Sequence, residues 1–300
     1  MKALQLKNVS KTYDGKKFAL KDVSLTVNEG DIYGLLGANG AGKSTIIGSI
    51  TGLVNKDKGQ IEIFGKDLSS NETECKKLIG VVPQEFNFSI FEKVEDIILW
   101  QAGYFGISKK DALPQLEFLL DVLNLKDKRQ VPARALSGGM KRRLMIARAL
   151  IHKPKFLFLD EPTAGVDVEL RGQTLDFVKK LNKDHGVTIF LTTHYLEEAE
   201  SMCNKIAIIK EGQILKEESK ESLLSQLKSE TFVAKTKNGI NASFKNIEFK
   251  TVGENTEITI SNQQSLSKIF EIANENNVEI IDIRPKTNKL ESLYLELLKN

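Results

Sequence analysis

The sequence has few features of a secreted or membrane-spanning protein. Its only two cysteines, Cys75 and Cys203, lie far apart and form no Cys-x-x-Cys pair, which argues against a disulfide framework or a zinc site and agrees with a reducing cytoplasm. No stretch reaches about 18 uninterrupted apolar residues, and residues 1–8 lack the apolar core of a signal peptide. We therefore expect that the chain reaches any membrane only through a partner.

The sequence also lacks a strong charge of either sign. Its 43 lysines and arginines are nearly matched by 40 aspartates and glutamates, which leaves a formal net charge of +3. This balance does not favour a polyanionic partner, so we expect no nucleic acid to bind. With 300 residues, 41% hydrophobic and 28% charged, the chain should form one large globular domain or a large and a small one.

A glycine-rich loop carries the clearest functional signal. An apolar run at 32–36 precedes it and a helix-like run starting at Ile46 follows it, and the loop itself reads Gly37-Ala38-Asn39-Gly40-Ala41-Gly42-Lys43-Ser44-Thr45. This is the G-x-x-x-x-G-K-[ST] phosphate loop between a strand and a helix. Glycines let backbone N–H groups surround a polyphosphate, Lys43 would reach the β- and γ-phosphates, and the Ser44 hydroxyl would hold Mg²⁺. A chance glycine-rich turn is the alternative, and the strand–loop–helix setting disfavours it.

Two adjacent acids end a second buried strand. The run 156–159 is wholly apolar, as expected for a strand buried on both faces of a parallel sheet, and Asp160 and Glu161 follow it. Successive residues point to opposite sides, so the two acids can have different roles. Asp160 would hold Mg²⁺ through its water shell, and Glu161 would act as general base on the attacking water. Without the phosphate loop, solvated acids at a strand end would be the simpler interpretation.

A serine and two glycines stand before the helix-like run that follows Met140. Ser137-Gly138-Gly139 is typical of a helix N-cap followed by a turn, and the same arrangement presents backbone N–H groups to an anion. The two interpretations are compatible, because a cap without a carboxylate can receive a phosphate.

The remaining pattern predicts an α/β fold with a helical insertion and a small appendage. Alternation and buried runs predict strands at 4–9, 23–27, 32–36, 61–64, 79–82, 156–159, 187–191, 206–209 and 213–215. Apolar residues at helical spacing predict helices at 94–104, 112–123, 141–150, 168–184, 196–202 and about 220–227. The strand–helix alternation around residues 156–202 implies a parallel core.

The tail of the chain, residues 231–300, has a more polar composition than the sequence before it. It is rich in Asn, Glu, Lys, Ser and Thr, yet its pattern predicts about four strands and two helices, at 232–235, 247–250, 257–260, 264–274, 278–283 and 290–298. We therefore predict a nucleoside-triphosphate-binding domain over 1–227 and an α+β extension over 228–300.

In combination, these motifs resemble the ATPase subunit of ABC transporters over about residues 2–220. The resemblance rests on the phosphate loop, Gln84, Leu136-Ser137-Gly138-Gly139, the run 156–162 and His194, in that order. The Leu-Ser-Gly-Gly signature is the diagnostic element of this family. The resemblance implies an ABC-type phosphate-loop nucleoside triphosphatase with a mixed sheet core, an antiparallel β subdomain and a helical signature subdomain.

Four further roles follow only from this resemblance. Tyr13 would stack on adenine, Gln84 would touch Mg²⁺ and the attacking water, and His194 would contact the γ-phosphate. Asp167 would lie in the loop that communicates across a head-to-tail homodimer, in which two ATP molecules each lie between one subunit's phosphate loop and the other's signature segment. A packed or solvated histidine is the alternative for His194, although the C-terminal end of a strand is where open α/β sheets bind ligands.

Two departures from the commonest family pattern bear on the type of transporter. Met140 stands where many relatives have Gln, and the tail carries Leu290-Glu291-Ser292-Leu293-Tyr294. Both resemble exporter ATPases that work with a separate transmembrane permease, which implies a peripheral location on the cytoplasmic face of the plasma membrane. The alternatives are an importer ATPase subunit and a soluble, non-transport ABC ATPase. The latter is disfavoured because the chain has one cassette and no long coiled-coil insertion.

Overall fold

The computed structural model describes residues 1–164, 168–227, 229–237, 242–244, 247–252, 255–261, 266–276, 278–286 and 288–299. The chain divides into two compact units, Met1–Glu218 and Ser219–Asn300. The boundary predicted from the sequence, after residue 227, lies nine residues further on. The difference arises because helix α8 (Lys220–Ser225) packs against α10 (Lys289–Lys299) within the second unit.

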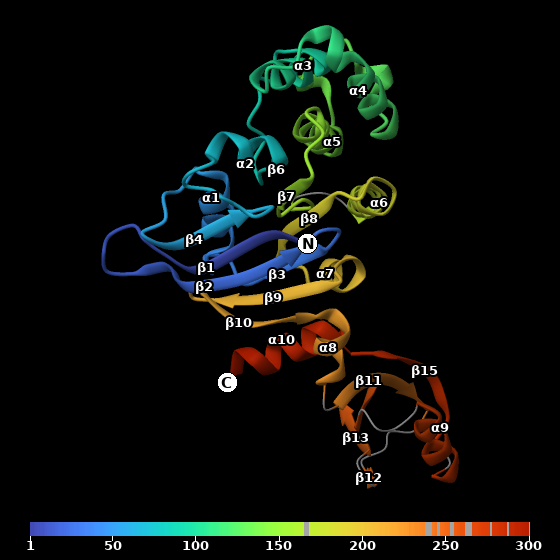
Figure 1. Ribbon diagram of the computed structural model, residues 1–300. Coiled ribbons are helices and arrows are strands. Elements are labelled where there is room, and N and C mark those ends of the chain that lie inside the picture. The colour runs from blue at the N-terminus through green and yellow to red at the C-terminus, as the bar shows by residue number, and fades with distance from the viewer. Residues whose placement is uncertain are drawn as a thin grey trace. The chain divides into compact units, whose positions relative to one another are not determined.

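A six-stranded sheet forms the centre of the first unit (Figure 1), with the strand order β10-β9-β3-β8-β7-β6. Strands β9, β3, β8, β7 and β6 pair in parallel, which confirms the predicted parallel core. The bounds are β3 (Ile32–Leu36), β6 (Ile79–Val82), β7 (Phe156–Asp160), β8 (Thr188–Thr193), β9 (Lys205–Lys210) and β10 (Gln213–Ser219). All residues of β3, β7 and β8 are buried, as expected for central strands covered on both faces.

A second, antiparallel sheet has the order β2-β1-β4-β5. Its strands are β1 (Lys2–Thr12), β2 (Phe18–Asn28), β4 (Lys58–Ile63) and β5 (Lys66–Asp67). Apolar residues of this sheet, of the six-stranded sheet and of α1 (Lys43–Thr51) form one buried cluster. Tyr33 stacks on Phe190 with ring centroids 5.3 Å apart, and Phe158 packs against the same Phe190 ring at 5.5 Å. The phosphate loop therefore lies between β3 and a helix fixed in the main core.

Helices α3 (Val94–Tyr104), α4 (Lys109–Val122) and α5 (Gly138–Leu150) lie side by side as a helical subdomain (Figure 1). Ser108 and Ser137 cap α4 and α5, each accepting a bond from the backbone N–H three residues further on. Between α4 and α5 lie two 3₁₀ turns, η1 (Lys126–Lys128) and η2 (Ala133–Ala135). Three other helices of this unit are α2 (Glu72–Leu78), which the sequence reasoning missed, α6 (Val168–His185) and α7 (Leu196–Met202).

The second unit contains a five-stranded antiparallel sheet with the order β12-β13-β14-β11-β15. Its strands are β11 (Ser229–Thr236), β12 (Ala242–Phe244), β13 (Ile247–Val252), β14 (Asn255–Ser261) and β15 (Ile280–Pro285). Ile269 and Ile272 of α9 (Leu266–Glu275) join Phe232 and Ile258 in its buried core. The α+β character was predicted, but the short strand β12 was not.

No helix in the described ranges combines the length and the apolar character needed to cross a bilayer.

Candidate nucleotide site

The phosphate loop turns directly from buried strand β3 into helix α1. Gly42 precedes α1 with φ 111°, and no side chain caps the helix. A Cβ at Gly42 would lie 2.7 Å from the Ala19 carbonyl, and one at Gly37 would lie 2.6 Å from the Ile209 carbonyl. Both positions therefore require glycine, and the first turn of α1 has N–H groups without a side-chain cap, an arrangement that favours binding of an anion.

Lys43 is the first residue of α1, and its ammonium group points back over the loop. Its Nζ donates to the carbonyls of Gly37 at 2.8 Å and Ala38 at 3.3 Å. The same Nζ lies 3.2 Å from Glu161 Oε1, and only 5% and 9% of the two side chains are exposed. Because a buried charge is costly without a partner, this ion pair ties the phosphate loop to the end of β7.

The Glu161 carboxylate has two further partners, and both were predicted site residues. Gln84 Nε2 donates to Oε2 at 3.1 Å, and His194 Nδ1 lies 3.3 Å from the same oxygen. The three residues come together because β6, β7 and β8 are parallel neighbours and each precedes one of them. Glu161 also has φ 46°, a left-handed conformation that non-glycine residues adopt at some energetic cost and that often occurs at functional sites.

Asp160 is held by a residue that the sequence reasoning did not single out. The Thr192 hydroxyl donates to Asp160 Oδ1 at 2.6 Å. The Glu161 N–H donates to the same hydroxyl and to the Thr192 carbonyl, both at 3.1 Å. Thr192, near the end of β8, thus bonds the Asp160 side chain and the Glu161 backbone. Its position two residues before His194 is the feature of the sequence that could have indicated this role.

Other predicted site residues lie at the surface of the first unit. Tyr13 is 68% exposed, with its hydroxyl 3.5 Å from Thr45 Oγ1. Ser137 is exposed, and its hydroxyl accepts the Met140 N–H at 3.3 Å, which confirms the predicted N-cap. The described contacts do not bring Ser137 to the phosphate loop of its own chain. Asp167 lies outside the described residues.

Two arginines of α5 hold the segment that contains Gln84, and the sequence reasoning missed both. The buried Arg142 donates to the carbonyls of Pro83 at 2.7 Å and Gln84 at 2.8 Å. Burial lowers the pKa of its guanidinium, against the opposing field of Asp160. Arg148 donates to the Asn87 carbonyl at 3.0 Å. The helix that starts at the signature segment is therefore fastened to the loop after β6.

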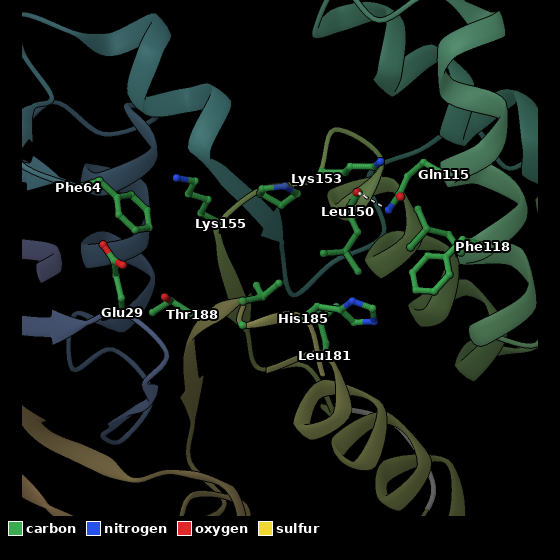
Figure 2. Close-up of a pocket in the computed structure, with 14 residues that line it drawn as sticks. Glu29, Phe64, Gln115, Phe118, Leu150, Lys153, Lys155, Leu181, His185 and Thr188 are labelled. Carbon is green, nitrogen blue, oxygen red and sulfur yellow. Dashed lines mark hydrogen bonds between the residues drawn. The ribbon is translucent and has the colours of Figure 1, made fainter. Parts of the chain in front are cut away.

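A pocket of about 660 Å³ is separate from this site. Figure 2 shows it between α4, the end of α5 and the end of α6, with Lys155 and Thr188 on its wall. Lys155 immediately precedes β7 and Thr188 begins β8, whereas Glu161 and His194 follow the ends of these strands. The pocket is thus at the opposite edge of the sheet from the phosphate loop.

The loop and the convergent side chains define a phosphate-loop nucleoside triphosphatase. The family model described as ABC transporter matches residues 20–164. The linearmycin resistance ATP-binding protein LnrL of Bacillus subtilis is 33% identical over 98% of this chain and 97% of its own length. The Nod factor export ATP-binding protein I of Burkholderia lata is 38% identical over 74% of this chain and 72% of its own length.

A solved structure agrees with these relatives. The dimeric structure of MJ0796, a bacterial ABC transporter cassette, matches with a TM-score of 0.65 and 29% identity over 72% of this chain and 98% of that one. The chain belongs to the ATP-binding subunits of ABC transporters, which bind and hydrolyse ATP. The resemblance stated from the sequence is therefore confirmed.

The Thr192 contacts lead to a testable prediction. Thr192→Val removes the hydroxyl but keeps the shape of the side chain, so it should lower ATPase kcat about tenfold, the effect of losing roughly 1.4 kcal/mol of positioning. Thr188→Val is the matched control, because it removes a buried hydroxyl that accepts the Gly30 N–H at 3.0 Å at the other end of β8. Steady-state ATPase assays of the two variants check this. Equal losses in both would refute a specific role for Thr192.

Proposed function

We propose that this chain powers an exporter by hydrolysing ATP at the interface of a head-to-tail homodimer. The single observation that carries the proposal is the convergence of Lys43, Gln84 and His194 on the Glu161 carboxylate at the edge beside the phosphate loop. Glu161 is the proposed general base, Lys43 binds the β- and γ-phosphates, and His194 contacts the γ-phosphate. Residues 37–45 bind the phosphates, and Tyr13 stacks on adenine.

The proposed cofactor is Mg²⁺, held by Ser44, Asp160 and Gln84 together with the nucleotide. Ser44 is exposed at the start of α1, and Asp160 ends β7 beside the phosphate loop, so oxygen donors are available from two sides. Mg²⁺ prefers such ligands and keeps several waters.

The signature segment is proposed to complete the site of a second copy. Ser137 and Gly138 are exposed at the start of α5, a position from which they can contact the ATP on the partner's phosphate loop. Asp167 is proposed to lie in the loop that communicates between the two sites. The dimeric cassette structure that the chain resembles supports this assembly.

An exporter is favoured by the Nod factor export relative, and a resistance protein matches nearly the whole chain. Its 98% coverage includes the region beyond residue 227, so the extension is shared with that resistance protein. The Met140 signature agrees with the same class. The proposed partner is a separate transmembrane permease, to which the chain attaches peripherally at the cytoplasmic face of the plasma membrane.

The proposed docking surface consists of Phe86, Phe88, Ile90 and Phe91, after Gln84. Phe91 is 70% exposed, Phe86 and Ile90 are also exposed, and Phe88 is half-buried. Part of this cluster is therefore accessible in the subunit. Clustered exposed aromatic side chains are typical of protein interfaces.

The role of Glu161 is tested by Glu161→Gln. The amide keeps the shape of the side chain but cannot accept a proton, so turnover should fall at least about 100-fold while ATP still binds. Because hydrolysis would separate the subunits, the variant should accumulate as an ATP-bound dimer on size-exclusion chromatography. Glu85→Gln, at an exposed neighbour of Gln84, is the control and should stay near wild type. Near-normal turnover in Glu161→Gln would remove Glu161 from the mechanism.

The composite site is tested by mixing two inactive variants. Lys43→Ala damages a subunit's own phosphate loop, whereas Ser137→Arg should block only the site on its partner. A heterodimer of the two has one intact site and one site with both defects. The mixture should therefore regain part of the ATPase activity that neither variant shows alone. Full activity of Ser137→Arg by itself would contradict a two-subunit site.

The docking surface is tested by Phe91→Asp. Replacing this exposed ring by a charged side chain should release the protein from the membranes of the cells that produce it. Its thermal stability should not fall, because an exposed ring contributes little packing. Leu53→Asp is the control, since Leu53 is 84% exposed on the same unit outside the docking surface. The membrane-bound fraction is measured by sedimentation and immunoblotting. Retention of Phe91→Asp at the wild-type level would exclude this surface.

A further inference from the structure

A buried carboxylate on α7 has no part in the proposed mechanism. Glu198 is 2% exposed, and its two oxygens accept bonds from two threonine hydroxyls. Thr163 donates to Oε1, and Thr193 donates to Oε2 at 2.8 Å. Arg171 Nε lies 3.7 Å from Oε1 and supplies a compensating positive charge. Removing an ionised carboxylate from water costs free energy, so its burial indicates that it has a structural or functional role.

The two threonines belong to the two segments that carry site residues. Thr163 lies two residues after Glu161, and Thr193 immediately precedes His194. Both are buried, and the Thr193 hydroxyl also accepts the Tyr195 N–H at 2.9 Å. One carboxylate thus fixes the segment after β7 and the end of β8 relative to each other.

A second set of contacts leads from Glu198 to His194 through aromatic rings. The Arg171 guanidinium carbon lies 4.3 Å from the centroid of the Tyr195 ring. That ring packs against the His194 imidazole with centroids 4.1 Å apart. His194 Nδ1 in turn lies 3.3 Å from Glu161. Both the backbone and the ring of His194 are therefore restrained by groups that Glu198 holds.

We propose that Glu198 is a positioning residue for ATP hydrolysis, which holds Glu161 and His194 in register across β7 and β8. The inference rests on the proposed roles of those two residues. A carboxylate suits this task because each of its oxygens can accept bonds while the Arg171 charge is neutralised. Glutamine at this position would keep the volume but offer one acceptor oxygen, so one threonine hydroxyl would have to reorient.

Glu198→Gln should lower kcat about 10- to 100-fold, since small displacements of reacting groups cost rate on that scale. The KM for ATP should stay within about twofold, because Lys43 and the phosphate loop do not contact Glu198. Glu197→Gln, the exposed neighbour on α7, is the matched control and should resemble wild type. A Glu198→Gln enzyme with unchanged kcat, or with the loss confined to KM, would overturn the proposal.

A spectroscopic measurement separates this proposal from the proposed function. The chain has three histidines, so the imidazole signals of the full chain can be assigned by NMR with single substitutions. Glu198→Gln should shift the His194 signals and leave those of His152 and His185 unchanged. Unshifted His194 signals would overturn the positioning role. Absence of ATPase activity in the wild-type chain would instead refute the proposed function, and the NMR comparison would still apply.

A second pair of variants applies if Glu198→Gln does not fold. Thr163→Val removes the hydroxyl that donates to Glu198, whereas Thr163→Ser keeps it. Thr163→Val should lower kcat, whereas Thr163→Ser should keep most of the wild-type kcat. Equal activity of the two would overturn the proposal, because Glu198 could then not act through Thr163.

Discussion

The buried ion pair between Lys43 and Glu161 is the interaction on which the nucleotide site depends. Neither charge would be stable at this depth alone, so the phosphate loop after β3 and the turn after β7 must approach each other. Strand β8 lies between β3 and β7 in the sheet, and the pair spans its carboxyl end. That geometry places His194 beside Glu161 and explains why the side chains from separate strands meet at one edge.

Three side chains hold the segments around this ion pair in place, because each makes more than one hydrogen bond. Thr192 bonds both Asp160 and Glu161, Glu198 holds Thr163 and Thr193, and Arg142 bonds two consecutive carbonyls of the Gln84 segment. Arg142 stands on α5, whose N-terminus is the signature segment. A displacement of the Gln84 segment would therefore strain contacts with the helix proposed to bind the partner's ATP.

Individual strands, helices and motifs of this arrangement could be predicted from the sequence, because short stretches of residues define them. The bounds of β3, β6, α3 and α7 match the predicted ranges, since the pattern of apolar residues defines them. The phosphate loop and the two acids at the end of β7 were recognised by spacing. The roles assigned to the site residues, Tyr13, Asp167 and the signature segment included, remain predictions.

The contacts between residues that lie far apart in the sequence could not be predicted. Nothing in the spacing of Thr192, Arg142 or Glu198 shows which distant group each contacts, because each has a partner about 30 to 60 residues away whose position depends on strand order. The boundary after Glu218 was missed for a similar reason, since α8 packs against α10 near the other end of its unit. Strand β12 has three residues, too few for alternation to be visible.

The proposed mechanism requires that Lys43 bind the β- and γ-phosphates of ATP and that Glu161 remain available to act on the attacking water. The most direct test is a crystal structure of Glu161→Gln with ATP and Mg²⁺. The account predicts two copies related head to tail, with Lys43 Nζ on the β- and γ-phosphates and the Ser137 segment of the other copy against the same nucleotide. ATP bound to a single subunit, with Lys43 still on the Gly37 and Ala38 carbonyls and remote from the phosphates, would contradict it.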